Sequence, residues 1–226
     1  MNICSIDPGS KNFAICIENV SYEKLKLLNC PKKNERYISD GIRQDTKNKK
    51  DILIPSLKYK EFLNEVILCS KTVICENIDI TMGEKMKNSK NLTDKMLLNI
   101  NTYLQENKNI LDKCDVILIE KQMSFKGKNN PMAIKIAHFC YSWFLINYGE
   151  SKKIIDFMAY NKTQVMGASN NMNKAMRKKW SSKQCVDIWN ARKDDIMIKK
   201  LEKIKKKDDI GDTLLMCLSY IIMDYY

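Results

Sequence analysis

The N-terminal segment, residues 2–18, constrains the fold more than any other stretch. Its two apolar runs, residues 3–6 and 13–17, flank a Pro-Gly pair and therefore predict a β-hairpin. Asp7 stands where the first strand meets the turn. Taken alone, Asp7 is explained by the turn, in which an Asp side chain accepts backbone N–H groups. Two further acidic sites downstream make a functional role the competing interpretation.

A second acidic site, Glu120, ends a strand that we expect at residues 115–122, where four branched apolar residues stand in a row. A helix expected at residues 93–113 precedes this strand, so the strand should run parallel to the first one. The carboxyl ends of parallel strands meet at one edge of a sheet, which predicts that Glu120 lies near Asp7. The alternative is that Glu120 is an ordinary polar strand end.

The third acidic site, Asp209 and Asp212, begins an apolar C-terminal helix that should lie against the sheet. Because the two residues are three apart, they share one face of the first helical turn. A capping box is the alternative, with Asp209 as the N-cap and Asp212 as its partner.

If the three sites converge, four carboxylates share a small volume. Two unit charges about 4 Å apart repel by about 4 kcal/mol at an effective dielectric constant of about 20. A domain has a net stability of only about 5–15 kcal/mol, so either cations occupy the site or the carboxylates do not converge. With His138 as the single histidine, any metal chemistry should use carboxylates and favour a hard ion such as magnesium or manganese.

Positive charge is concentrated in one part of the chain. The formal net charge is +12, and residues 171–207 hold 13 basic and 4 acidic residues, which is +9 of that total. This excess favours a polyanionic partner, with nucleic acid first and an anionic membrane surface second. The alternative is a Lys-rich composition that only solvates the surface. The candidate DNA contacts are Lys126 and Lys128 in a basic loop and Arg177 and Lys183 in the basic region.

The remaining segments fit one domain spanning residues 1–226. We expect a third antiparallel strand at residues 25–30 and a fifth strand at residues 153–158. Between them, about residues 31–91 carry too little apolar surface for a core of their own and are predicted to be an insertion, with a short strand at 72–75.

The nine cysteines are dispersed and form no Cys-x-x-Cys pair, which is typical of small buried side chains in a reducing compartment. No run approaches the roughly 18 apolar residues of a membrane span, and the N-terminus lacks the pattern of a signal peptide. We therefore expect an intracellular protein that does not enter a membrane.

Three short motifs, taken in order, resemble a known family. Ser5-Ile-Asp7-Pro-Gly-Ser, Ile119-Glu120-Lys-Gln122 and Asp209-Ile-Gly-Asp212 are similar to the motifs of RuvC-like Holliday junction resolvases, most closely those of poxviruses and other large DNA viruses. The resemblance implies a ribonuclease H-like α/β fold: a five-stranded mixed sheet, with three antiparallel strands and then two parallel ones, flanked by helices. It also implies a homodimer that binds four-way DNA junctions and makes paired symmetric nicks with 5′ phosphate and 3′ hydroxyl ends. A viral member would act at a cytoplasmic replication site.

The resemblance further implies the roles of particular residues. The catalytic acids, which would hold two Mg²⁺ ions or Mn²⁺ in their place, are Asp7, Glu120, Asp209 and Asp212. Family members place a lysine near the cleaved phosphate, and Lys178 or Lys179 is the candidate here. Asp208 would replace Asp209 if the alignment is displaced by one residue.

Other functions stay open at the level of the sequence. One is a non-catalytic basic protein that binds nucleic acid and uses its acids as caps and turns. Another is a ribonuclease H-like nuclease that acts on other branched DNA or on RNA–DNA hybrids. An ATPase of the actin and sugar-kinase type shares the Asp-x-Gly-Ser hairpin, but it needs two domains and more glycine-rich loops than 7 glycines in 226 residues suggest.

Overall fold

The computed structural model describes residues 1–42, 51–83, 91–122, 130–204 and 206–226. Its strands are β1 (Asn2–Pro8), β2 (Phe13–Val20), β3 (Tyr37–Ile42), β4 (Asp51–Pro55), β5 (Ser70–Ile78), β6 (Val116–Lys121) and β7 (Lys153–Met158). Its α-helices are α1 (Tyr22–Leu25), α2 (Leu57–Leu68), α3 (Asp94–Glu106), α4 (Lys108–Leu111), α5 (Pro131–Tyr148), α6 (Ala159–Val165), α7 (Lys174–Ala191), α8 (Asp195–Glu202) and α9 (Lys207–Tyr225). Two short 3₁₀ turns are η1 (Lys33–Glu35) and η2 (Gly149–Ser151).

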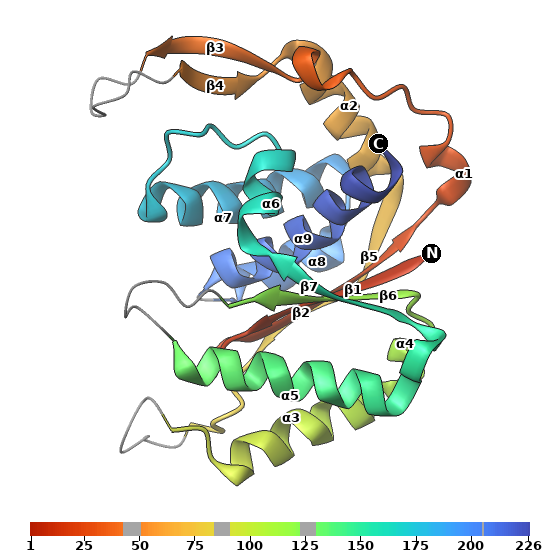
Figure 1. The fold of residues 1–226 in the computed structure, drawn as a ribbon, viewed down its shortest axis with the longest axis vertical. Coiled ribbons are helices and arrows are strands. Elements are labelled where there is room, and N and C mark those ends of the chain that lie inside the picture. The colour runs from red at the N-terminus through yellow and green to blue at the C-terminus, as the bar shows by residue number, and fades with distance from the viewer. Residues whose placement is uncertain (43–50, 84–90, 123–129, 205) are drawn as a thin grey trace.

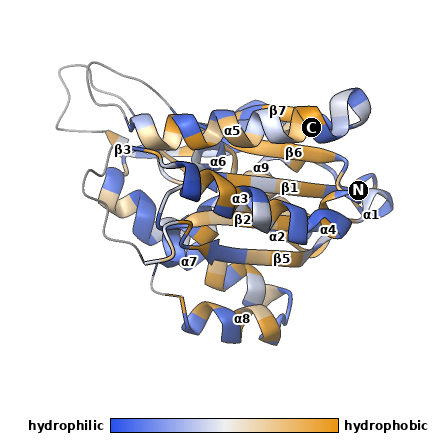
Figure 2. Ribbon diagram, turned by 90° about the horizontal axis from the view of Figure 1, so that it is seen from below, coloured by the Kyte–Doolittle hydropathy of each residue, from blue (hydrophilic) through white to orange (hydrophobic). Residues whose placement is uncertain are grey.

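Five strands form one mixed sheet in the order β5-β2-β1-β6-β7, which can be followed across Figure 2. β2 pairs antiparallel with both β1 and β5, whereas β6 pairs parallel with both β1 and β7. The hairpin of β1 and β2, the parallel strand at 115–122 and the fifth strand at 153–158 are therefore confirmed. So is the expected sheet of three antiparallel strands followed by two parallel ones.

The third strand of the sheet is not where the sequence pattern placed it. Residues 25–30 form no strand; α1 ends at Leu25, and the side chain of Leu27 is 85% exposed. The third strand is β5, which is nine residues long and includes the short strand expected at 72–75. A strand at residues 25–30 would have had to bury Leu27, whereas β5 buries Cys75 against β2.

The single domain with an insertion at about residues 31–91 stays a prediction, but two elements of that stretch belong to the main body. Helix α2 packs its buried face into the core, and β5 is a strand of the sheet. The separate part is the two-stranded β3–β4 hairpin, which lies beyond α6 and α7 from the sheet (Figure 1).

Helices cover both faces of the sheet (Figure 1). One core cluster joins the sheet to α3 and α5, and the other joins it to α2, α7, α8 and α9. Helix α9 is apolar nearly all round and lies on β1, β2 and β5, as expected. A hydrogen bond from Ser5 Oγ on β1 to the Thr213 carbonyl (2.7 Å) fixes its position.

Two expectations about side chains and segments can be checked against this fold. Eight of the nine cysteines are buried and Cys30 is partly buried, and all nine are free thiols. Among the described residues, no helix combines the length and hydrophobicity that a membrane crossing requires.

Candidate active site

The carboxyl ends of β1 and β6 bring Asp7 and Glu120 together. The parallel ladder pairs Ile6 with Ile119, so Asp7 and Glu120 are the next residues in register. Ile119 belongs to the core on the α5 side, and because side chains alternate along a strand, Glu120 faces the α9 side. The turn alternative expected the Asp7 side chain to accept a backbone N–H group. In the structure the Gly9 N–H donates to the Asp7 backbone carbonyl instead (2.9 Å), so the turn alone does not explain the carboxylate.

Helix α9 supplies the other two acids. Its N-cap is Lys206, without a side-chain capping bond, so the capping-box alternative for Asp209 and Asp212 is wrong. Asp212 Oδ1 accepts a hydrogen bond from Ser181 Oγ of α7 (2.6 Å). Asp209 Oδ2 is buried and has no hydrogen-bond partner within the described residues. A buried oxygen of this kind is costly unless something else binds it.

Helices α7 and α9 approach closely beside these acids. A Cβ atom on Gly211 would lie 2.5 Å from the Ser181 carbonyl oxygen. Only glycine therefore lets the α7 backbone come near enough for the Ser181 hydroxyl to reach Asp212.

A buried lysine that the sequence analysis missed joins the acids. Lys162 of α6 is 6% exposed, and its Nζ lies 2.7 Å from Glu120 Oε1 and 2.7 Å from Asp212 Oδ2. Burial favours the neutral amine, but the two carboxylates outweigh it and raise the pKa of Lys162. Gln122 donates to the second Glu120 oxygen, Oε2, at 3.2 Å.

The remaining negative charge is not balanced. Burial raises the pKa of Asp7 well above its usual value; Glu120, Asp212 and Asp209 add to this, and Lys162 opposes it. Burial and the neighbouring Asp208 raise the pKa of Asp209 to about 6. Four acids and one buried lysine thus leave a surplus that a cation would neutralise.

The four acids offer carboxylate oxygens, which are the ligand type that hard divalent cations prefer. In this structure, Lys162 bridges two of the four acids, and no three His, Cys, Asp or Glu side chains in the described ranges already form a ligand set around one point. Asp7 and the unpaired oxygen of Asp209 are the groups left for an ion.

A cavity of about 370 Å³ opens beside Glu120, Lys162 and Asp212, and its rim is basic. Lys174, Arg177 and Lys178 of α7 line it. Lys178 pairs with Asp208, the acid weighed as a replacement for Asp209.

The other predicted cations lie elsewhere. Lys179 is exposed and is not among the described residues that line this cavity. Lys183 is exposed and pairs with Asp187 (2.6 Å). Lys126 and Lys128 fall outside the described residues.

Lys162 could have been found from the sequence. It follows the fifth strand by four residues, so a parallel strand order places it at the same edge as Glu120. A single lysine after a strand is a weaker sequence signal than the basic run at Arg177–Lys179, whose residues lie nearer the surface.

The strand order, the flanking helices and the acids at one edge define an α/β protein with the ribonuclease H-like fold. A similar solved structure is that of fowlpox virus resolvase with its substrate Holliday junction DNA, with a TM-score of 0.55 and 20% identity over 100% of both chains. The resemblance to RuvC-like resolvases is thus confirmed for the fold.

Sequence relatives come from iridescent viruses. The chain is 28% identical to uncharacterized protein 170L of invertebrate iridescent virus 6, over 96% of this chain and 87% of that protein. It is 26% identical to uncharacterized protein 97L of invertebrate iridescent virus 3, over 96% of this chain and 98% of that one. No family model matches the chain.

Proposed function

We propose that this protein is a divalent-metal-dependent endonuclease that resolves four-way DNA junctions. The observation that carries the proposal is the set of four acids, two of which Lys162 bridges, with Asp209 Oδ2 buried and without a partner among the described residues. The basic cavity rim and the fold shared with a viral resolvase support DNA as the substrate.

Each residue of the site has a proposed task. Lys162 and Ser181 hold Asp212, and Lys162 and Gln122 hold Glu120, so these two carboxylates are fixed in orientation before substrate arrives. Burial and the neighbouring carboxylates raise the pKa values of Asp7 and Asp209, and a bound cation would offset both causes. Lys174 and Arg177, which line the cavity, would contact phosphates of the strand that enters it.

Asp7 and Asp209 would hold the metal directly, and Glu120 and Asp212 would join them through oxygen lone pairs that Lys162, Gln122 and Ser181 do not use. Mg²⁺ is the first choice and Mn²⁺ a substitute. When bound, two such ions would lower the pKa of a water and stabilise the departing 3′ oxygen, which gives 5′ phosphate and 3′ hydroxyl ends.

The test uses an end-labelled four-way junction, with and without Mg²⁺, and three proteins: wild type, Asp7→Asn and Asp224→Asn. Asp224 is a matched control because it lies at the far end of the same α9 and pairs with Lys153 (2.8 Å). We expect paired, ligatable nicks from wild type and Asp224→Asn only with metal. Asp7→Asn should bind the junction without cutting it.

If wild type binds the junction but does not cut it in Mg²⁺ or Mn²⁺, the proposal is overturned and the non-catalytic nucleic-acid-binding function is favoured. Equal cleavage of flaps or RNA–DNA hybrids would instead favour another ribonuclease H-like nuclease. Calorimetric titration of wild type and Asp7→Asn with Mg²⁺ reports on the metal site independently of cleavage.

Paired symmetric nicks need two centres, so we also propose a homodimer with twofold symmetry. A groove of about 560 Å³ along α3 and α5 is the proposed contact surface, since Leu98 and Ile146 beside it are 63% and 82% exposed. Ile146→Asp should reduce the mass measured by light scattering from dimer to monomer. Ile196→Asp, at an equally exposed position on α8, should leave it unchanged.

A further inference from the structure

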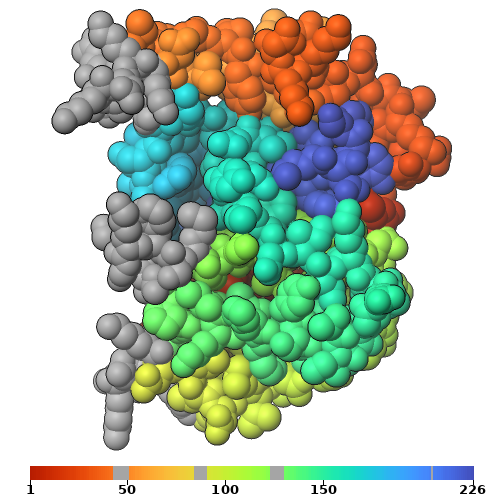
Figure 3. Space-filling model, in the orientation of Figure 1, coloured from red at the N-terminus to blue at the C-terminus, as the bar shows by residue number. Residues whose placement is uncertain are grey.

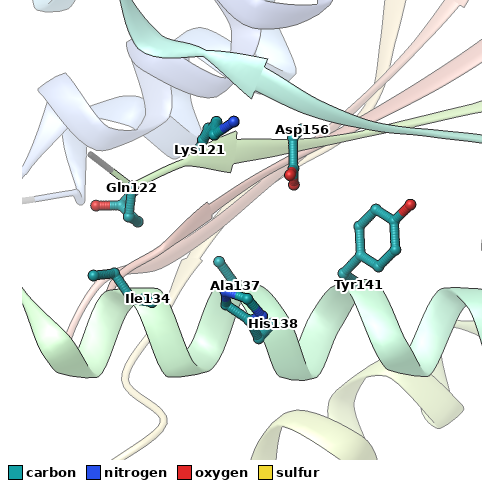
Figure 4. A pocket seen from close by; sticks show the side chains of 7 residues that line it. All are labelled: Lys121, Gln122, Ile134, Ala137, His138, Tyr141 and Asp156. Carbon is teal, nitrogen blue, oxygen red and sulfur yellow. The ribbon is translucent and has the colours of Figure 1, made fainter. Parts of the chain in front are cut away.

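A second cavity, here called the edge pocket, lies between the ends of β6 and β7 and helix α5. Its volume is about 270 Å³. The face of the molecule drawn in Figure 3 is hollowed between α5 and β7. The polar lining comes from both sides, with Lys121, Gln122 and Asp156 from the strand ends and His138 and Tyr141 from α5 (Figure 4).

The register shows why the edge pocket opens on the opposite face of the sheet from the acids. Asp156 pairs with Ile119 in the β6–β7 ladder, and Ile119 faces the α5 side. Glu120 faces the α9 side, because neighbouring side chains of a strand alternate. Lys121 and Gln122 line both cavities, so the two spaces meet around the end of β6.

The lining suits one unpaired nucleobase. Tyr141 is partly buried and offers an aromatic surface for stacking, and Ile134 and Ala137 are the apolar lining residues. The carboxylate oxygens of Asp156 accept hydrogen bonds, so this residue selects a base edge that carries donors. Lys121 lines both cavities and offers a cation for the phosphate that would connect the two nucleotides.

We propose that the edge pocket binds the base of the nucleotide next to the phosphate held at the acids, and that Asp156 makes it prefer an amino-bearing base. Guanine fits best, because its N1–H and N2–H groups point at one carboxylate together. Thymine fits worst, since its pairing edge has one donor between two acceptors. This inference rests on the proposed nuclease function and adds a base preference to it.

The experiment cleaves junctions whose crossover nucleotides are randomised and sequences the cut ends. Wild type should favour guanine over thymine by about tenfold at one position beside the nick. Asp156→Asn replaces a carboxylate, which accepts hydrogen bonds, with an amide, which both donates and accepts them. This variant should raise the share of cuts beside thymine. Ala137→Trp, which fills the pocket without touching the acids, should flatten the preference. The control Asp224→Asn should keep the wild-type distribution.

If the distribution of bases beside the cut is the same in Asp156→Asn, Ala137→Trp and wild type, the proposal for the edge pocket is overturned and the nuclease proposal stands. If wild type cuts no junction, the nuclease proposal fails, and binding then decides the pocket separately. Metal-free protein is titrated with short single strands that differ only in a central guanine or thymine. A guanine preference that Asp156→Asn removes supports the pocket, and equal affinities overturn it.

Discussion

Charge is buried at two places along α7, and the two places differ in how completely it is neutralised. At the C-cap of α7, Arg192 meets Glu18 of β2, whose side chain is fully buried. In the middle of α7, Ser181 reaches the acids of the candidate site. Both clusters pair a carboxylate with a buried cation, so burial alone does not distinguish them.

The Glu18 cluster is saturated with hydrogen bonds. Arg192 Nη2 lies 2.8 Å from Glu18 Oε2, and Nη1 lies 3.2 Å from Oε1. Arg192 also donates to Ser70 (2.5 Å), and Thr72 donates to Glu18 (2.5 Å) while accepting from Trp189 (2.9 Å). One positive and one negative charge cancel there, which is the arrangement expected of a structural ion pair.

The candidate site has four acids against one buried lysine, and within the part of the chain that the structure describes an oxygen of Asp209 has no partner. The proposed metal site and the structural ion pair therefore differ in uncompensated charge and not in burial. The following predictions test this distinction, beginning with the largest effect.

Removing one acid from each cluster should have opposite consequences. Asp7→Asn should abolish cleavage and leave the free energy of unfolding unchanged or higher, because it relieves repulsion. Glu18→Gln should lower the free energy of unfolding by about 3–5 kcal/mol, because it leaves Arg192 unpaired. Its cleavage per folded molecule should stay near wild type. Urea denaturation and single-turnover cleavage measure the two effects; a loss of both in either variant would contradict the distinction.

Removing each cation should separate the clusters by their response to metal. Arg192→Met and Lys162→Met should each cost about 3–5 kcal/mol in EDTA, because buried carboxylates lose their partner. Mg²⁺ should restore part of the stability of Lys162→Met, since an ion can bind its acids, and none of that of Arg192→Met. Thermal unfolding with and without Mg²⁺ checks this. Equal rescue of both variants would count against a specific metal site.

The raised pKa of Asp209 predicts how stability varies with pH. Its pKa rises from 3.8 to about 6 in the folded state, so the folded chain holds this proton more tightly than the unfolded chain. Its contribution is therefore greatest below pH 3.8 and is lost as pH rises through about 6. We compare the free energies of unfolding of Asp209→Asn and wild type in EDTA. The difference in favour of Asp209→Asn should grow by on the order of 1 kcal/mol as the pH rises from 4.5 to 7. A constant difference measured by urea denaturation would contradict this.

The smallest effect is expected from the hydroxyl that orients Asp212. Ser181→Ala should lower the free energy of unfolding by about 1 kcal/mol and slow cleavage modestly, because Asp212 keeps its contact with Lys162. Ser182→Ala is the neighbouring control, since Ser182 Oγ bonds only to the Lys178 carbonyl within the described residues. A cleavage loss as large as that of Asp7→Asn would mean that Ser181 has a direct role.

The sequence was sufficient for features that depend on short patterns. The apolar run before Glu120 predicted a strand parallel to β1 and placed Glu120 near Asp7 at one edge of the sheet. The arrangement of all five strands came from the resemblance to RuvC-like resolvases. The third strand was missed because residues 25–30 have a strand-like composition. Leu27 is nevertheless exposed to solvent, and that outcome depends on tertiary packing and not on local composition. Lys162 was missed because its position after the fifth strand is a weaker signal than a basic run, and because its burial depends on contacts of α6 with α9, which is distant in the sequence.

The order of the acids along the chain has a consequence for protein synthesis. Asp7 is synthesised 205 residues before Asp212, yet the Asp212 carboxylate lies near enough to raise the pKa of Asp7. A domain of this kind completes its packing only after its last helix has emerged. A nascent chain can therefore form much of the sheet before Asp209 and Asp212 are present. The proposed cleavage of DNA would then begin only after α9 has been translated.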